Sequence, residues 1–350
     1  MELIQLNKDD ADIFIGFAQS RIGGRSENQD SYGSAKTGRG FLVTVCDGMG
    51  GGPGGKTASS IAVQEIITGV QEASDDEEIP NMLIKAIRRA NLKIIETANA
   101  SAESEISLLG MGTTTTVLLI NEDAAYAAHV GDSRIYQIRG NNKVFRTFDH
   151  SMVFDLVKQK VITEEQARLS AQSNIITRAL GIQPDVEVDV EVLPYQKGDR
   201  FVLTTDGIHG SMPEQKLIKM IANKKSALGS VTDDIATYAD DLGREAGGTH
   251  DNLTIAIIET KNNSKLKPKM RMKTKLIILC LSLLCAASIA FNITQAMGSR
   301  ENKAKAALAD SLDKELNRKD SVHKVEIESL NSKLKIAEVK IKNTKEITNN

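Results

Sequence analysis

Aspartates stand at the ends of several short apolar segments of this sequence, which is a placement that suits metal-assisted chemistry. The segments FLVTVC, AAYAAHVG and FVLTT each lead into an aspartate, and another aspartate precedes LTIAII. These four residues are Asp47, Asp132, Asp206 and Asp251. A single Asp-Gly pair usually marks a turn, but carboxylates gathered at strand ends repel one another unless cations neutralise them. Oxygen ligands favour Mg²⁺ or Mn²⁺ over zinc, so the pattern predicts a hard-metal site.

The segments that position these aspartates show both strand-like and helix-like patterns. β-Branched, apolar segments predict strands over Phe41–Cys46, Thr114–Ile120, Ala124–Val130, Arg134–Arg139, Arg200–Thr205 and Leu253–Ile258. Amphipathic segments predict helices over Ser59–Val70, Asn81–Ala98, Met152–Lys160, Glu164–Ala171, Pro213–Ala222 and Ser230–Gly243. The strands are grouped with helices rather than alternating strictly with them. This order predicts an α+β fold with antiparallel sheets.

Eight motifs follow one another in an order that resembles the PPM-type, or type 2C, protein phosphatases, and the bacterial members most of all. They are Arg25 with NQD (28–30), DGMGG (47–51), GTTTT (112–116), VGDSR (130–134), DHS (149–151), ITRALG (176–181), TTDG (204–207) and HDNLT (250–254). Each motif alone is a weak signal, whereas eight in sequence over residues 14–259 are a strong one. The resemblance implies a four-layer sandwich, in which helices flank two antiparallel β-sheets. It also implies hydrolysis of phosphoserine and phosphothreonine in proteins by a metal-bound hydroxide.

The same resemblance implies roles for the acidic residues. Asp47 is expected to bridge two Mn²⁺ or Mg²⁺ ions, and the carbonyl of Gly48 to ligate one of them. Asp206 and Asp251 are expected to complete the other ion's ligands, and Asp132 to hold a third, weaker ion together with Asp206.

Two further residues are assigned through the resemblance. Arg25 is expected to grip the substrate phosphate, for which a planar guanidinium is suited, and Asp30 to support the metals through water. The sequence departs from the family at Gln29, where many members have Glu, and at Met49, where animal members have His. A third departure is His209–Ser211, where the family usually has an aromatic residue or Thr and an acid; the sequence offers no explanation for it.

Two alternatives compete with the phosphatase interpretation. Residues Gly50–Thr57 match the P-loop pattern G-x-x-x-x-G-K-[ST] and lie between a predicted strand and a predicted helix, which favours a nucleotide hydrolase. That interpretation leaves GTTTT, VGDSR and HDNLT unexplained. The other alternative keeps the fold and the membrane anchor but gives the protein a scaffolding role, binding phosphoproteins with little catalysis.

Charge is distributed unevenly along the 350 residues. Residues 1–259 contain 25 Lys and Arg against 37 Asp and Glu, a net charge of −12, whereas residues 260–275 contain seven basic residues and no acidic one. An acidic domain repels nucleic acid, so no nucleic-acid partner is expected. The three cysteines, Cys46, Cys280 and Cys285, show no paired spacing typical of a disulfide framework or a zinc site.

The C-terminal third predicts a membrane anchor. Leu276–Phe291 contains no charge and the uncharged stretch continues to Ser299, so a helix over residues 276–297 is long enough to span a bilayer. The basic linker 260–275 suits an anionic cytoplasmic leaflet, which predicts a single-pass protein of the plasma (inner) membrane with a cytoplasmic catalytic domain (1–259) and an external tail. The tail, residues 298–350, is predicted to be helical.

A short heptad seam in the tail carries Ile327, Leu330, Leu334, Ala337 and Ile341. It is compatible with a coiled coil that forms homo-oligomers, with a solvated helix or with a disordered tail. The predicted partners are phosphorylated proteins near the membrane, including substrates of a membrane serine/threonine kinase.

Overall fold

The computed structural model describes residues 3–7, 13–50, 53–105, 107–172, 175–267 and 310–314. The chain divides into two units, Met1–Pro268 and Lys269–Asn350. The second unit is described only as the exposed helical segment 310–314. The predicted membrane span (276–297) lies wholly outside the described residues, as do the rest of the tail and the end of the linker. Within the described ranges, no helix has the length and apolar character needed to cross a bilayer.

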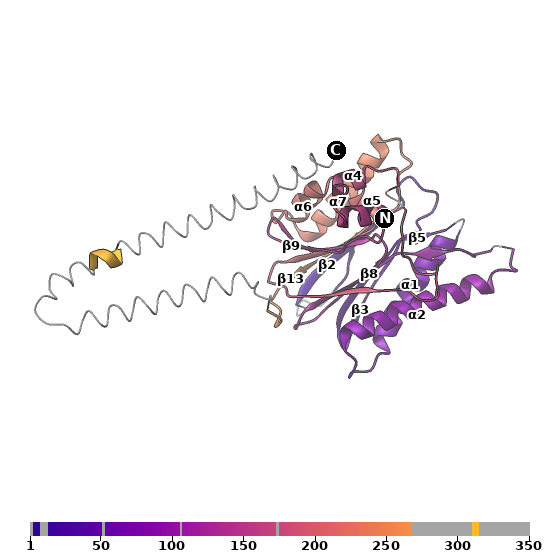
Figure 1. Ribbon diagram of the computed structural model, residues 1–350, viewed down its shortest axis with the longest axis horizontal. Coiled ribbons are helices and arrows are strands. Elements are labelled where there is room, and N and C mark those ends of the chain that lie inside the picture. Colours follow the sequence, from indigo (N-terminus) through magenta and orange to yellow (C-terminus); the bar gives the residue numbers. More distant parts are fainter. Residues whose placement is uncertain are drawn as a thin grey trace, which may run out of the picture. The chain divides into compact units, whose positions relative to one another are not determined.

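Two antiparallel sheets form the centre of the first unit (Figure 1). One has six strands in the order β1 (Ile4–Gln5), β2 (Phe14–Arg21), β13 (Leu253–Thr260), β12 (Arg200–Thr204), β9 (Arg134–Arg139) and β10 (Asn142–Arg146). The other has five, in the order β11 (Asp189–Leu193), β8 (Ala125–Val130), β7 (Thr115–Ile120), β4 (Gly40–Cys46) and β3 (Ser31–Thr37). A separate two-stranded sheet consists of β5 (Gly48–Met49) and β6 (Gly112–Thr113).

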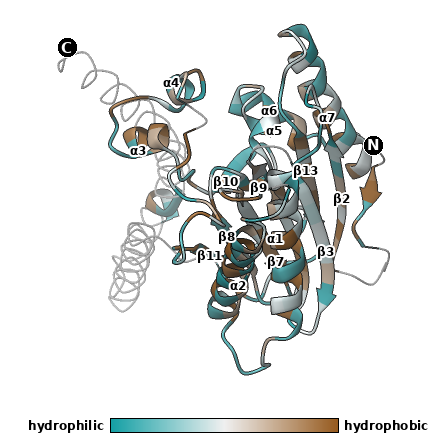
Figure 2. Ribbon diagram, turned by 90° about the vertical axis from the view of Figure 1, so that its right-hand side faces the viewer, coloured by the Kyte–Doolittle hydropathy of each residue, from teal (hydrophilic) through white to brown (hydrophobic). Residues whose placement is uncertain are grey.

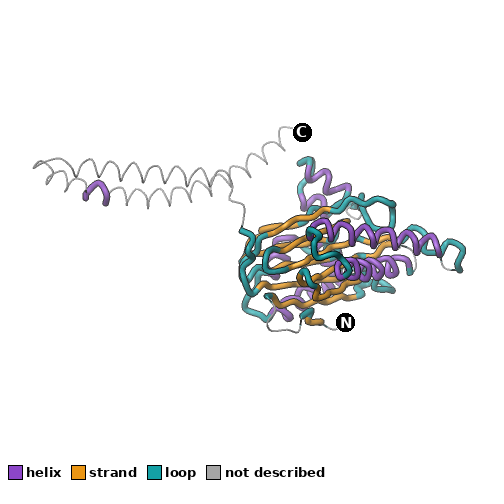
Figure 3. The backbone as a smooth tube through the Cα atoms, turned by 90° about the horizontal axis from the view of Figure 1, so that it is seen from below, coloured by secondary structure: helices purple, strands orange, loops and turns teal. Residues whose placement is uncertain are grey.

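Helices cover the outer faces of both sheets (Figure 1), and Figure 3 shows helices lying across the strands as seen from below. The helices are α1 (Gly54–Gln71), α2 (Ile79–Ala100), α3 (Met152–Lys158), α4 (Glu164–Arg168), α5 (Asp206–His209), α6 (Glu214–Ile221) and α7 (Leu228–Glu245). The long helices α1 and α2 pack against the five-stranded sheet, and α6 and α7 pack against the six-stranded one. The expected sandwich of two antiparallel sheets flanked by helices is confirmed.

The alternation of side chains along a strand explains why the central strands are apolar on both of their faces. In β4, Leu42 faces the core under α1 and α2, whereas Val43 faces the core between the sheets. In β12, Phe201 faces the core between the sheets, whereas Val202 faces α6 and α7. Because side chains of a strand alternate between its faces, a strand buried on both sides must be apolar throughout.

The six predicted strands and six predicted helices all occur, with ends shifted by a few residues. The strands β2, β3, β10 and β11 and the two-residue strands β1, β5 and β6 were not predicted, nor was the single turn α5. Two predicted short helices, α3 and α4, stand beside the sandwich in Figure 2. Their starts are capped: Ser151 accepts a hydrogen bond from the backbone N–H of Phe154, and Thr163 forms a capping box with Gln166.

Candidate active site

Four aspartates that are far apart in the chain meet at one end of the sandwich. Asp47 follows β4 of the five-stranded sheet, and Asp206 and Asp251 stand at the ends of neighbouring strands of the other sheet. Asp132 lies in the turn from β8 to β9 and therefore joins the two sheets. All four line one cavity of about 500 Å³, together with Arg25 and Gly48.

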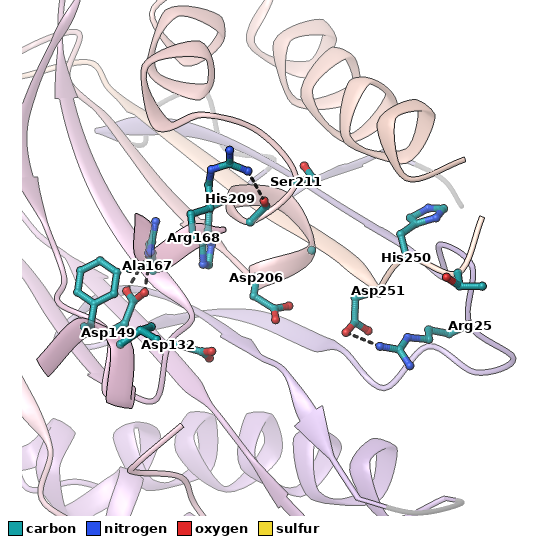
Figure 4. Close-up of a pocket in the computed structure, with 16 residues that line it drawn as sticks. Arg25, Asp132, Asp149, Ala167, Arg168, Asp206, His209, Ser211, His250 and Asp251 are labelled. Carbon is teal, nitrogen blue, oxygen red and sulfur yellow. Dashed lines mark hydrogen bonds and ion pairs between the residues drawn. The ribbon is translucent and has the colours of Figure 1, made fainter. Parts of the chain in front are cut away.

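An adjoining cavity of about 340 Å³ shares Arg25, Asp132, Asp206 and Asp251 and extends towards α3 and α4. Figure 4 shows these three aspartates along one side of it, with Arg25 joined to Asp251. The guanidinium Nη2 lies 2.8 Å from the Asp251 carboxylate, and about half of the arginine side chain (52%) is exposed. Arg25 therefore stands at the mouth of the site, within reach of an entering anion.

Burial and mutual repulsion perturb the carboxylates. Burial, followed by the charges of neighbouring aspartates, raises the pKa of Asp47 well above its usual range, and burial and Asp206 do the same for Asp132. Burial and the charge of Asp251 raise the pKa of Asp206 to about 6. The pKa of Asp30 rises to about 7, mainly through burial. Such a cluster holds protons at neutral pH unless a cation replaces them.

Unsatisfied oxygens show where a cation fits. Oδ1 of Asp206 and Oδ1 of Asp30 are buried and have no hydrogen-bond partner among the described residues. The other oxygen of Asp30 accepts hydrogen bonds from the hydroxyls of Thr254 (2.6 Å) and Thr205 (3.0 Å). A buried carboxylate oxygen without a donor is costly in a metal-free protein, and an oxygen-preferring cation satisfies it. The donor set, which is carboxylate and carbonyl oxygen, fits Mg²⁺ or Mn²⁺.

The GTTTT motif fixes the backbone of Asp47. The carbonyl of Asp47 accepts hydrogen bonds from the Thr114 N–H and the Thr113 hydroxyl, both at 2.8 Å, and its N–H donates to the Thr114 hydroxyl at 3.0 Å. Sequence reasoning used this motif only for the resemblance and did not identify its role. The threonines therefore fix the backbone of Asp47, and its side chain remains available to the cavity.

In the P-loop pattern, Gly55 allows the start of α1 to pack closely against the turn at Gly48. A Cβ on Gly48 would lie 2.0 Å from the carbonyl oxygen of Gly55, so the start of α1 rests directly on the turn after Asp47. Lys56 Nζ donates to the carbonyl of Asp30 at 2.8 Å and to the Ser31 hydroxyl at 3.1 Å. Since its lysine is directed into the protein at Asp30 and Ser31, the pattern does not form a nucleotide phosphate cradle.

Asn252 orients the segment that carries Arg25. Its amide nitrogen donates to the carbonyls of Ile22 (2.7 Å) and Glu27 (2.9 Å), and its amide oxygen accepts the N–H of Gln29 at 2.8 Å. His209 is buried, and its Nδ1 lies 3.0 Å from the hydroxyl of Thr204. The departure at position 209 is therefore a buried, hydrogen-bonded residue that lines the smaller cavity together with Asp206.

Carboxylates gathered from two sheets around one cavity, with an arginine at its opening, are typical of enzymes that hydrolyse phosphate esters with the help of cations. A family model described as protein phosphatase 2C matches residues 18–242. The chain belongs to the protein phosphatase 2C family and is a metal-dependent serine/threonine protein phosphatase.

Relatives agree with this assignment. The serine/threonine phosphatase stp of Listeria welshimeri is 35% identical over 240 residues, which are 68% of this chain and 88% of that protein. The crystal structure of serine/threonine phosphatase Stp1 from Staphylococcus aureus is similar with a TM-score of 0.64 and 27% identity, over 71% of this chain and 95% of that one. The catalytic domain of phosphatase PstP, solved in complex with two manganese ions, is similar with a TM-score of 0.57 and 26% identity, over 71% and 99% of the two chains.

Proposed function

We propose that this cavity hydrolyses phosphoserine and phosphothreonine in proteins with a pair of Mn²⁺ or Mg²⁺ ions. The observation that carries the proposal is the convergence of Asp47, Asp206 and Asp251, from both sheets, on one cavity in which Asp206 Oδ1 is buried without a donor. The manganese pair in the PstP structure supports it.

The ligands are assigned as follows. Asp47 would bridge the two ions, with the Gly48 carbonyl on one of them and Asp206 and Asp251 on the other. Asp132, which lines the same cavity, would hold a third and weaker ion with Asp206. Asp30 lies behind these residues and would act through water.

When bound, the cations supply an activated water nucleophile near neutral pH and neutralise charge on the phosphoryl group. The protein's own contribution is to place the phosphate against that water. Arg25 can exchange its single contact with Asp251 for a bidentate contact with the phosphate, which orients the ester for in-line attack. The partial burial of the aspartates limits the screening of these charges by bulk water.

The full chain tests the proposal with a phosphothreonine peptide and Mn²⁺, with and without chelator. Phosphate release should require the metal and should be abolished in Asp206→Asn. Asp185→Asn is the matched control, because Asp185 is 91% exposed and absent from the cavity linings. No phosphate release by the wild type with any divalent ion would favour the scaffolding role, whereas full activity of Asp206→Asn would contradict the metal-ligand role assigned to Asp206.

We also propose that residues 276–297 tether the enzyme to the plasma (inner) membrane, with the catalytic domain in the cytoplasm and the tail outside. The uncharged stretch and the basic linker before it support this proposal. The full chain should remain with membranes after alkaline carbonate, whereas a chain ending at residue 267 should be released. Release of both chains would contradict the tether.

Tethering would direct the enzyme to substrates near the membrane, including those of a membrane serine/threonine kinase. Phosphorylation of membrane proteins should therefore rise when the gene is deleted, and unchanged levels would remove this part of the proposal. We also propose that the heptad seam of the tail forms homo-oligomers. Cross-linking should then give oligomers of the full chain but not of the chain ending at residue 267.

A further inference from the structure

A histidine beside the cavity holds the turn that carries Asp132. The backbone N–H of His150 donates to the carbonyl of Gly131 at 2.9 Å, and the N–H of Gly131 donates to Nδ1 of the His150 ring at 3.1 Å. Gly131 has a φ of +104°, and a Cβ there would lie 2.7 Å from the side chain of Thr114. One residue thus satisfies both polar backbone groups of a turn that only glycine can form.

The other ring nitrogen is fixed as well. Nε2 of His150 lies 3.2 Å from the carboxylate of Asp189 in β11, which also accepts a hydrogen bond from Arg178 at 3.0 Å. Because the Gly131 N–H points at Nδ1, the proton of the neutral ring must sit on Nε2 and point at Asp189. Burial, with His129 and Arg178, lowers the pKa of His150 to about 4, so the ring stays neutral at physiological pH.

The same contacts exclude a metal site at this place. Atoms of His129, His150 and Asp189 lie within 4.8 Å of one another, which is close enough to suggest one. However, both nitrogens of His150 already have partners, and Nε2 of His129 lies 2.9 Å from the carbonyl of Phe148. The guanidinium of Arg178 is 3.2 Å from His150 Nε2 and already supplies the positive charge.

Contacts on the far side of Asp132 complete its support. The hydroxyl of Ser133 lies 2.7 Å from that of Thr114, which also binds the backbone of Asp47. Arg134 makes two hydrogen bonds, of 2.8 and 2.6 Å, with Asp149, the residue before His150. Asp132 is therefore held between two anchored neighbours: Gly131 is bound by His150 of the DHS motif, and Ser133 by Thr114 of the GTTTT motif.

We propose that His150 is a positioning residue for Asp132: its Nδ1 holds the Gly131 N–H so that the Asp132 carboxylate faces the third cation. The inference rests on the proposed function, because it requires that ion. His150 itself does not line either cavity, so it acts only through the turn.

Isosteric substitutions separate the two ring nitrogens. In His150→Asn the amide oxygen can replace Nδ1 as acceptor for Gly131, whereas in His150→Gln the amide nitrogen can replace Nε2 as donor to Asp189 and the acceptor is lost. Binding of Mn²⁺ to the full chain is measured by electron paramagnetic resonance of the free ion. His150→Gln should weaken the weakest binding step by about 10-fold or more, the loss typical of removing a ligand's supporting partner, and leave the two tighter steps unchanged. His150→Asn should remain within about threefold of wild type.

Activity gives a second readout, since His150→Gln should raise the Mn²⁺ concentration for half-maximal rate while leaving the KM for a phosphothreonine peptide unchanged. His129→Gln is the matched control: it changes the stacked neighbouring ring but keeps a donor for Phe148, and its Mn²⁺ curve should follow wild type.

Identical Mn²⁺ binding by His150→Gln and wild type would overturn the inference, as would equal weakening in His150→Asn and His150→Gln. A wild-type chain that is active but binds only two ions would overturn it while leaving the proposed function standing. A chain that binds no Mn²⁺ would overturn both.

Discussion

The metal-free enzyme should become more stable when one of its site carboxylates is neutralised. Asp206 is half-buried where it lines the two cavities, and its pKa rises from 3.8 to about 6 in the folded protein. Replacing it by asparagine keeps the size and removes the charge.

The magnitude and sign follow from linkage. Asp206 is an acid whose pKa is higher in the folded state than in the unfolded state. Below the unfolded-state pKa it does not lower the free energy of unfolding, and the loss of stability grows as pH rises through the folded-state pKa. From 3.8 to about 6 the cost reaches about 3 kcal/mol, at about 1.4 kcal/mol for each pH unit. In a domain of this size, about 3 kcal/mol corresponds to about 6–12 °C in Tm.

The assay is thermal unfolding of wild type and Asp206→Asn in chelator between pH 4 and 8. The two curves should coincide near pH 4 and separate as pH rises, with the variant more stable above pH 6. Added Mn²⁺ should reverse the order, because only the wild type gains from binding at this oxygen. Equal stability at pH 8 in chelator, or greater stability of the metal-free wild type, would refute the electrostatic reasoning.

Three further outcomes are expected. Lys56→Ala should lower stability by about 1 kcal/mol through loss of its hydrogen bonds to Asp30 and Ser31, as measured by urea unfolding, and should change kcat little; loss of all phosphatase activity from a folded variant would contradict this purely structural role of Lys56. Arg25→Ala should lower kcat/KM for a phosphothreonine peptide by about 10²-fold, since a bidentate charged contact contributes about 3 kcal/mol, with Mn²⁺ binding retained; an unchanged kcat/KM would remove Arg25 from phosphate binding. Gly48→Ala should abolish Mn²⁺ binding or folding, seen by calorimetry and circular dichroism, because its methyl group would overlap Gly55; a folded, metal-binding variant would contradict the packing described.

Much of the fold was accessible from sequence because the inner strands are buried on both faces. Such strands, like β4 and β7, are continuous apolar runs that stand out from their surroundings. The strands β3 and β11 lie at the two edges of their sheet and are half-buried, so their sequences, SYGSAKT and DVEVL, carry no comparable signal.

The candidate site was likewise predictable from the sequence only in part. Aspartates at strand ends and the order of motifs indicated the cavity, because strand ends of a sandwich meet at its edge. The support of Asp132 could not be found in this way, since Gly131 and His150 are joined across a turn and hairpin whose path no periodicity encodes. The P-loop pattern misled for the opposite reason: it is a local match, and only the packing against Gly48 shows where Lys56 points.

The division of the ligands between the sheets has a mechanical consequence. The two sheets meet largely through apolar side chains such as Val43 and Phe201, while the carboxylates at their common end repel one another. An ion held, as proposed, by Asp47 from one sheet and Asp206 from the other would tie the two sheets together at the edge where this repulsion acts. Divalent metal supply would then govern the lifetime of the folded enzyme against proteases as well as its turnover.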